Sequence, residues 1–339
     1  MGRRGRGRWV RRQALRVPRA PGERREAPPP AAEALAHFRF AVMAERGRSA
    51  AHWREVAQRA EGLGYDTLLM PDHITDQLAP VAALTAIADA TTSLRVGSFV
   101  FDNDYRNPVM LAKEATTLDL LSGGRLEFGI GAGWNTRDYR QLGIPYDTPK
   151  VRVDRLEEAI ALIKRLWTEE KVTHAGTHYR VREAMVLPRP TQRPHPPVMI
   201  GGGGPRMLRI AAREAQIVAI APTLNPKGGP KLRTITVGSV EKRVATLRRS
   251  PRFSELELNV IVFDAQVTDA ARSLIDALTG RLKSALTAIV DTPFFMYGSR
   301  ASLVEDLLAR RERLGISYIA LPGRAMRAFG PVVAALKGK

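Results

Sequence analysis

One strand–helix–strand pattern constrains the fold of this chain more than any other part of its sequence. A short apolar segment at residues 94–101 is followed by a helix-like segment at 108–121. A second apolar segment, 125–134, then runs into glycines. Pro108 suits the first turn of a helix because its missing N–H would be unpaired there, and Asn107 before it is a favourable N-cap. Short apolar strands joined by a helix are typical of parallel sheets that helices cover.

The same alternation continues along the chain. Strands are expected at residues 38–43, 65–70, 94–101, 125–134, 197–200, 216–220, 256–263 and 317–321. Apolar residues at helical spacing follow most of them, for example at 81–91, 240–247 and 270–290. Eight strands that each lead into a helix fit a single (β/α)8 TIM barrel, an α/β fold, better than a doubly wound sheet.

Two segments depart from this alternation. Residues 135–197 form an insertion between strands 4 and 5, with a hairpin predicted at 172–181, and a long insertion is usually a lid or a dimer surface. Residues 1–36 hold ten arginines, little periodicity and three consecutive prolines. Such a composition buries too little apolar area to fold, so we expect a disordered tail on a barrel domain at 37–339. The tail is a plain extension, an over-long gene start, a nucleic-acid-binding arm or an address signal. No apolar segment follows its paired arginines, which argues against a secretory signal.

Composition narrows the class of protein. The net charge is +19, of which +7 lies in residues 1–36 and +12 in the rest, and a basic balance suggests anionic partners. The chain has no cysteine, which excludes disulfides, thiolate nucleophiles and cysteine-ligated metals and fits a reducing, cytoplasmic interior. No apolar run reaches the roughly 18 to 20 residues of a membrane span, so no membrane association is expected.

Several motifs carry a resemblance to a known family. These are 97–108 with its Arg-Asn-Pro ending, 118–126 (Leu-Asp-Leu-Leu-Ser-Gly-Gly-Arg-Leu) and 129–134 (Gly-Ile-Gly-Ala-Gly-Trp). Together they resemble the bacterial luciferase-like oxidoreductases, and most of all the members that use the deazaflavin coenzyme F420. The resemblance covers roughly residues 38–336. It implies a TIM barrel, a small-molecule substrate and commonly a homodimer.

His73 is the candidate catalytic residue. It follows the second predicted strand, and an imidazole can accept or donate a proton near neutral pH. From the residues alone, Asp72 could cap a short helix with His73 packed against it. The resemblance implies instead that His73 faces the reactive ring of the cofactor. Asp72 would then contact polar atoms of the cofactor or orient the loop.

The end of the third strand is the second candidate. The resemblance implies a bulge there with a non-proline cis peptide that presses on the back of the cofactor ring. Alignment of residues 97–108 puts this bond at Phe99–Val100, so Phe99, Val100 and Asp102 are expected to contact the cofactor. The alternative is an ordinary buried strand with Asp102 in the loop after it.

Trp134 is the third candidate, for a pocket wall beside the cofactor. It follows Gly131-Ala132-Gly133, and glycines let backbone approach a ligand closely. The alternative is a turn followed by a core tryptophan. Some F420-dependent relatives carry an acidic residue near this position. Such a residue is absent here, so the resemblance assigns no second acid–base group.

The fourth candidate is a glycine turn after the fifth strand. It consists of Gly201, Gly202, Gly203, Gly204, Pro205 and Arg206. Glycines that open a helix at Pro205 expose several N–H groups at its positive end, which suits a phosphate, and Arg206 adds a charge. In relatives this loop holds the cofactor phosphate. A simple flexible turn is the alternative.

Other chemistries lack their motifs. The glycine turn does not complete G-x-G-x-x-G, and neither a phosphate-binding G-x-x-x-x-G-K-[ST] loop nor a G-x-S-x-G elbow occurs. The six histidines lack metal spacing, and His174 and His178 are predicted to pair on the surface of the hairpin. No metal site is expected.

The sequence therefore predicts an oxidoreductase that transfers a hydride between coenzyme F420 and an unidentified small organic substrate. The first alternative is a luciferase-like monooxygenase that uses reduced FMN and oxygen. The second is a nucleic-acid-binding protein that uses the arginine-rich tail, with steeply salt-dependent binding. The sequence does not identify the substrate.

Overall fold

The computed structural model describes residues 36–44, 46–47, 49–271, 273–275 and 292–339. The tail predicted at residues 1–36 lies outside these ranges except for Ala36, and so does most of the helix predicted at 270–290.

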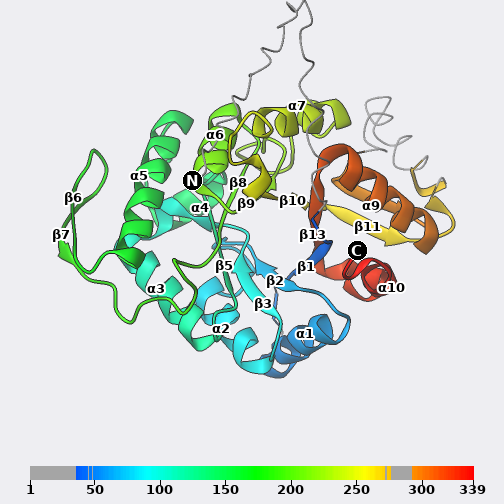
Figure 1. Cartoon of the computed structure of the whole chain (residues 1–339), viewed down its shortest axis with the longest axis horizontal. Helices are drawn as coiled ribbons and strands as arrows, with labels where there is room; N and C mark the ends of the chain where they lie inside the picture. The colour runs from blue at the N-terminus through cyan, green and yellow to red at the C-terminus, as the bar shows by residue number, and fades with distance from the viewer. Residues whose placement is uncertain (1–35, 45, 48, 272, 276–291) are drawn as a thin grey trace, which may run out of the picture. The chain divides into compact units, whose positions relative to one another are not determined.

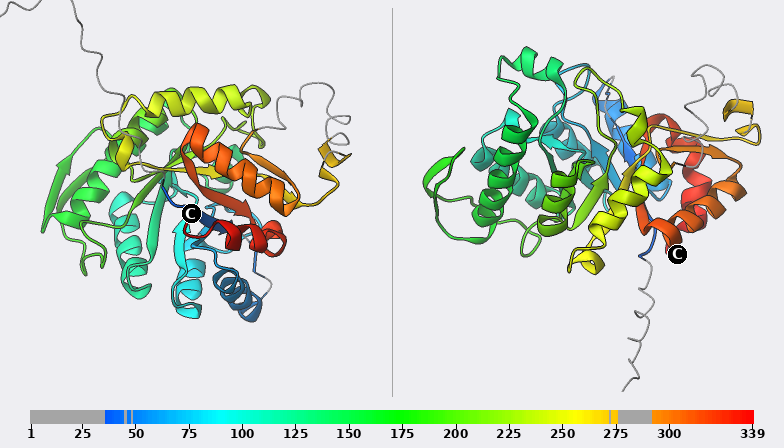
Figure 2. Two further views of the ribbon diagram at one scale, coloured as in Figure 1. Left: turned by 45° about the vertical axis from the view of Figure 1, so that its right-hand side comes forward. Right: turned by 90° about the horizontal axis from the view of Figure 1, so that it is seen from above.

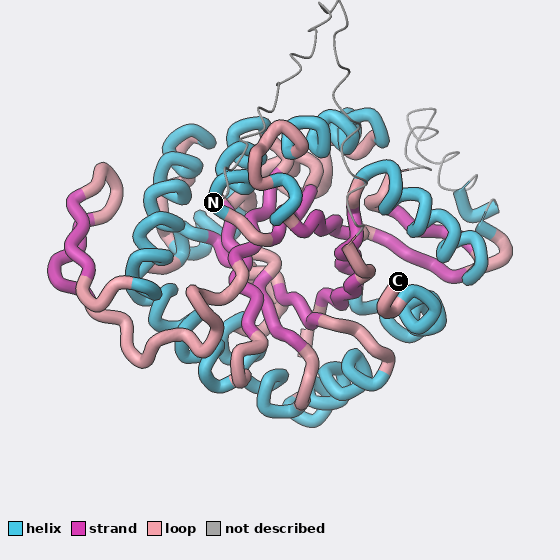
Figure 3. The backbone as a smooth tube through the Cα atoms, viewed as in Figure 1, coloured by secondary structure: helices cyan, strands magenta, loops and turns pink. Residues whose placement is uncertain are grey.

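Eight parallel strands form a closed barrel. They are β1 (Arg39–Met43), β2 (Thr67–Met70), β3 (Arg95–Ser98), β5 (Leu126–Gly131), β8 (Val198–Gly202), β9 (Ile217–Ile220), β10 (Glu257–Ile261) and β13 (Ile316–Pro322). Each strand pairs in parallel with the next, and β13 pairs with β1 to close the ring. Figures 1 and 3 show this ring of strands inside a layer of helices. The predicted (β/α)8 barrel is confirmed.

Pro108 and Pro205 each begin a helix, as predicted from the sequence. Several helices cover the barrel. They are α1 (Ala50–Gly62), α2 (Pro80–Ala90), α3 (Pro108–Leu121), α5 (Pro149–Thr168), α6 (Pro205–Glu214), α7 (Val237–Leu247), α9 (Arg300–Leu314) and α10 (Met326–Leu336). In α3 the side chain of Asn107 accepts the N–H of Val109, and Pro108 occupies the first turn. Within the described ranges, no helix combines the length and apolarity needed to cross a bilayer.

Within the described ranges, two strand pairs lie outside the barrel. β6 (Val172–Ala175) and β7 (Arg180–Ala184) form the predicted antiparallel hairpin, which lies beside α5 in all views (Figures 1 and 2). Glu158 of α5 holds it by accepting His174 Nε2 at 2.9 Å and two backbone N–H groups of the hairpin turn. The parallel pair β11 (Asp264–Val267) and β12 (Phe295–Gly298) was not predicted, because its strands are distant in sequence.

A buried carboxylate joins five strands near their amino ends. Glu127 of β5 is 1% exposed and accepts Arg95 Nε at 2.9 Å and Tyr318 Oη at 2.8 Å. It also accepts Thr67 Oγ1 at 3.2 Å and pairs with Arg39. Burial raises the pKa of Glu127, but Arg39 and Arg95 outweigh burial and hold the pKa below its ordinary value. This group of residues, the Glu127 cluster, fixes β1, β2, β3, β5 and β13 against one another.

We expect Glu127→Gln to lower the free energy of unfolding by about 3 kcal/mol, because Arg95 loses the carboxylate it pairs with and Arg39 keeps only Glu257. Urea unfolding of the purified protein measures this. Glu55→Gln is the control, since Glu55 makes only a surface ion pair with Arg59 and should cost at most about 0.5 kcal/mol. Equal effects of the two changes would show that the Glu127 cluster does not stabilise the barrel.

Candidate active site

The candidate residues lie on four loops at one end of the barrel. Parallel strands all finish at the same end, so the loops after β2, β3, β5 and β8 surround one mouth. The structure therefore brings the sequence-predicted loops together. It also changes the role that several of their side chains can take.

The carboxylate of Asp72 is hydrogen-bonded to other groups of the protein. Its carboxylate accepts both terminal nitrogens of Arg106, at 2.5 and 3.1 Å, and the backbone N–H of Asp102 at 3.1 Å. The residue is only 5% exposed. Of the two roles considered for Asp72, this geometry favours orientation of the loops after β2 and β3 over contact with a cofactor.

His73 is hydrogen-bonded to a residue that was not predicted from the sequence. Its Nδ1 lies 2.6 Å from Oδ2 of Asp138, in helix α4 (Thr136–Leu142). The His73 side chain is 27% exposed, whereas that of Asp138 is fully buried. Because a carboxylate only accepts, Nδ1 carries the proton and Nε2 is the nitrogen left for chemistry.

Asp138 supplies the acidic group that is missing at Trp134. Its Oδ2 also accepts Asn135 Nδ2 at 2.9 Å and Tyr105 Oη at 3.2 Å, while Oδ1 is buried without a partner. The Trp134 ring meets His73 edge to face, with centroids 5.5 Å apart. One signal could have found Asp138: Asn135 caps α4, which places Asp138 one turn inside the helix next to the predicted loop.

The end of the third strand has the predicted backbone. The Phe99–Val100 peptide is cis, and the chain then continues as β4 (Phe101–Asp102), which pairs with β5. A Cβ atom on Gly131 would lie 2.7 Å from Val100 Cγ2, and one on Gly129 would lie 3.1 Å from Cγ1. The glycines of β5 therefore make room for Val100.

Asp102 lies beneath the glycine-rich turn. It is 6% exposed, and its Oδ1 accepts the N–H of Asp104 at 2.9 Å and Tyr139 Oη at 3.2 Å. Gly133 has a φ of +70°, and a Cβ there would lie 2.2 Å from Asp102 Oδ2. Burial raises the pKa of Asp102 to about 7. Asp102 thus supports the turn from behind, which argues against the cofactor contact expected for it.

The glycine turn has the backbone of an anion site. Helix α6 starts at Pro205, and its N-cap, Gly204, has no side chain to bond the first N–H groups. A Cβ on Gly203 would come within 2.1 Å of the carbonyl oxygen of Ala221, so only glycine fits there. Free N–H groups at the positive end of a helix suit a phosphate.

Arg206 is directed away from this turn. Its two terminal nitrogens pair with Asp154 and Glu157 of α5, and these carboxylates raise its pKa. The expected use of Arg206 for a phosphate therefore needs correction, because both carboxylates already neutralise it. No local sequence pattern predicted that α5 would supply them.

Arg243 of α7 is the cation that lies at the turn. It is 5% exposed, and it donates from Nε to the Gly203 carbonyl at 3.2 Å and from Nη1 to the Thr234 carbonyl at 2.9 Å. Among the described residues, no carboxylate pairs with it and Nη2 has no partner. Burial lowers the pKa of Arg243, so a bound anion would stabilise its charge.

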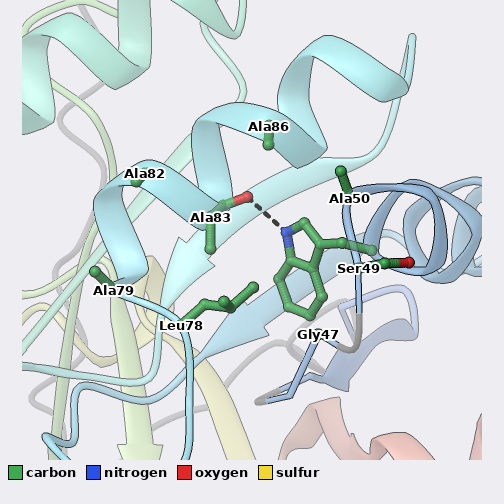
Figure 4. Close-up of a pocket in the computed structure, with 9 residues that line it drawn as sticks. Gly47, Ser49, Ala50, Leu78, Ala79, Ala82, Ala83 and Ala86 are labelled. Atoms are coloured by element: carbon green, nitrogen blue, oxygen red, sulfur yellow. Dashed lines mark hydrogen bonds between the residues drawn. The ribbon is translucent and has the colours of Figure 1, made fainter.

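A recess of about 360 Å³ between α1 and α2 is not part of this site (Figure 4). Five alanines, Gly47, Ser49, Leu78 and Trp53 line it, and Trp53 Nε1 donates to the Ala83 carbonyl at 2.9 Å. None of these nine residues carries a titratable side chain. The recess therefore offers no group for proton transfer.

Comparison with known proteins gives one family and several relatives. The model of the luciferase-like monooxygenases matches residues 33–329. The F420-dependent glucose-6-phosphate dehydrogenase of Intrasporangium calvum is 37% identical over 165 residues, 46% of this chain and 49% of that protein. The FMNH(2)-dependent dimethylsulfone monooxygenase of Pseudomonas putida is 30% identical over 166 residues, 47% of this chain and 46% of that protein. The chain thus spans about half the length of these curated relatives.

Solved structures agree on the fold. The coenzyme F420 dependent tetrahydromethanopterin reductase from Methanopyrus kandleri superposes with a TM-score of 0.70 at 17% identity, over 89% of this chain and 100% of that chain. At this identity the match supports the barrel fold alone.

We expect Asp102→Asn to change how stability depends on pH. Wild-type Asp102 keeps its proton in the folded state up to about pH 7, whereas the unfolded carboxyl loses it near pH 4, so its stabilising contribution falls between these values. Asparagine cannot lose this proton. The free energy of unfolding of the variant, relative to that of the wild type, should therefore rise by about 2 kcal/mol from about pH 5 to pH 8.

Urea unfolding across this pH range measures the difference. Asp76→Asn, at an exposed carboxylate, is the control and should give a constant offset. A constant offset for Asp102→Asn as well would contradict the raised pKa.

Proposed function

The chain belongs to the luciferase-like monooxygenase family, and from this premise we propose that it is an oxidoreductase that transfers a hydride between coenzyme F420 and a small organic substrate. The observation that carries the proposal is His73 at the mouth, held at Nδ1 by buried Asp138. Relatives named as F420-dependent glucose-6-phosphate dehydrogenases support the choice of cofactor.

The residues present fit such a cofactor at two points. The N–H groups of the glycine turn and the unpaired charge of Arg243 fit a phosphate. The rings of His73, after β2, and Trp134, after β5, meet edge to face, and both would face the ring of the cofactor. When bound, the deazaflavin supplies a ring carbon that carries the hydride.

The protein's own part is proton transfer and positioning. When the substrate is oxidised, Nε2 of His73 accepts the proton that the substrate loses as its hydride leaves, and in the reverse direction Nε2 donates it. Asp138 orients the imidazole and stabilises its positive form. Tyr105 donates to Asp138, and burial raises the pKa of Tyr105 so that it stays a donor. Trp134 limits rotation of the His73 ring.

The second candidate function is that of a monooxygenase that uses reduced FMN and oxygen, and the Pseudomonas putida relative supports it. Titration of the purified protein with F420 and with FMN, followed by absorbance, separates the two. We expect tight F420 binding and oxygen-independent turnover with a panel of alcohols, activated alkenes and glucose 6-phosphate. FMN binding with oxygen consumption, and no F420 binding, would support the second candidate instead.

Two substitutions test the roles of His73 and Asp138. His73→Ala should retain cofactor binding and lose turnover, because the proton has no acceptor. Asp138→Asn should lower kcat by about 10- to 100-fold and alter its pH profile, because asparagine can favour the wrong tautomer of His73.

Asp147→Asn is the matched control, since Asp147 pairs with Arg155 and does not contact His73. It should leave kcat unchanged. Full turnover by His73→Ala would remove His73 from the mechanism, and a wild-type pH profile for Asp138→Asn would remove the positioning role of Asp138.

A homodimer and a cytoplasmic location, both expected from the sequence, stay proposals. So does nucleic-acid binding by residues 1–36, which removal of that segment would abolish.

A further inference from the structure

A short turn carries Tyr105, the side chain that donates to Asp138. It is the 3-10 turn η1 (Asn103–Tyr105), in the loop after β3. A turn of this length makes few hydrogen bonds of its own, so contacts of its side chains determine where it lies. Residues of the insertion at 135–197 bind each of its three side chains.

Asp104, in the middle of the turn, is bound to α5. Its carboxylate accepts Nε and Nη2 of Arg155, both at 2.8 Å, and Tyr139 Oη at 2.8 Å. The Asp104 side chain is only 4% exposed. A guanidinium that binds both oxygens of a carboxylate fixes the orientation of the pair as well as its distance. Arg155 therefore fixes the middle of the turn against α5.

Asn103, the first residue of the turn, is bound to the β6–β7 hairpin. Its Nδ2 donates to Tyr179 Oη at 2.9 Å, and the residue is 1% exposed. Within the described ranges, the other contact of this Nδ2 is Asp104 Oδ1 at 3.4 Å, and Oδ1 of Asn103 has no partner. A buried amide donor that loses its partner costs its full desolvation penalty. The buried position of Asn103 therefore depends on the Tyr179 hydroxyl.

Tyr179 is itself fixed by α5. Its backbone N–H donates to Glu158 Oε1 at 2.9 Å, and its carbonyl accepts the N–H of Gly176 at 2.9 Å. Its half-buried ring packs against the hydrophobic core. Burial raises the pKa of Tyr179 to about 12, so the hydroxyl stays protonated at neutral pH. Arg155 and Glu158 lie about one turn apart on α5, which therefore holds both η1 and the hairpin.

We propose that Tyr179 of the inserted hairpin is a positioning residue for His73. Tyr179 holds Asn103, and the turn that begins at Asn103 presents Tyr105 to Asp138. Tyr105 is one of three side chains that contact Oδ2 of Asp138, and the same oxygen holds Nδ1 of His73. A shift of the turn would withdraw this donor and change how Asp138 orients the imidazole. The inference rests on the proposed function, because it concerns the proton transfer assigned to His73.

The expected effect is that of one hydrogen bond. Tyr179→Phe removes the hydroxyl but keeps the ring and the backbone contact with Glu158. The loss of one hydrogen bond between neutral groups corresponds to about a fivefold change in a rate or an equilibrium.

The test uses the full-length protein with coenzyme F420 and a substrate that the wild type accepts from the panel above. Y179F should lower kcat about fivefold and alter its pH profile in the same direction as D138N, with unchanged affinity for F420. Y105F should lower kcat by a similar factor, because it removes the donor to Asp138 directly. In Y105F/Y179F the second change should add nothing, because both act through the same contact.

Y65F is the matched control. The buried hydroxyl of Tyr65 donates to the Met326 carbonyl at 2.9 Å, and Tyr65 lies just before β2, at the amino end of the barrel. Y65F should therefore lower stability and leave kcat and its pH profile unchanged. Backbone hydrogen exchange in residues 103–107 should be faster in Y179F than in the wild type, and unchanged in Y65F.

A wild-type kcat and pH profile in Y179F would overturn the inference and leave the proposed function intact. Independent, multiplied effects in Y105F/Y179F would also overturn it. An equal loss of kcat in Y65F would do the same, since general destabilisation would then explain the result. If the wild type turns over no substrate with F420, the proposed function fails, and the inference about His73 fails with it.

Discussion

Glu127 is the buried charge on which the geometry of the barrel depends. It sits on β5 and accepts donors from β1, β2, β3 and β13, so one carboxylate sets five strands against each other. Removing a carboxylate from water is costly, and several charged and hydroxyl donors must compensate it. Because these donors lie near the amino ends of the strands, the opposite ends are left for loops. The Glu127 cluster therefore orients the mouth without taking part in it.

Two buried groups of opposite charge lie on different sides of the mouth. On one side, Asp138 lies behind His73 and aims a single ring nitrogen outward. On the other side, Arg243 lies beneath the glycine turn and has no carboxylate. A ligand with a redox ring at one end and an anion at the other matches this arrangement.

Much of the fold could be predicted from local patterns in the sequence. The eight barrel strands, the start of α3 at Pro108 and the β6–β7 hairpin all follow from apolar periodicity and capping residues close together in sequence. The resemblance also implied the cis peptide at Phe99–Val100, which the structure contains. The β11–β12 pair was missed because its two strands are brought together only by the fold.

The sequence by itself determined which loops meet at the mouth, since strand direction and strand order put them there. Only the tertiary structure decided which side chains on those loops are free. Arg206 is neutralised by α5, Asp72 is taken by Arg106, and Asp102 supports a turn from below. At the mouth, Asp138 is instead the carboxylate that contacts His73, and Arg243 is a cation without a carboxylate partner among the described residues. Charge pairing depends on distances of a few ångströms between separate helices, and no local pattern in a chain encodes those distances.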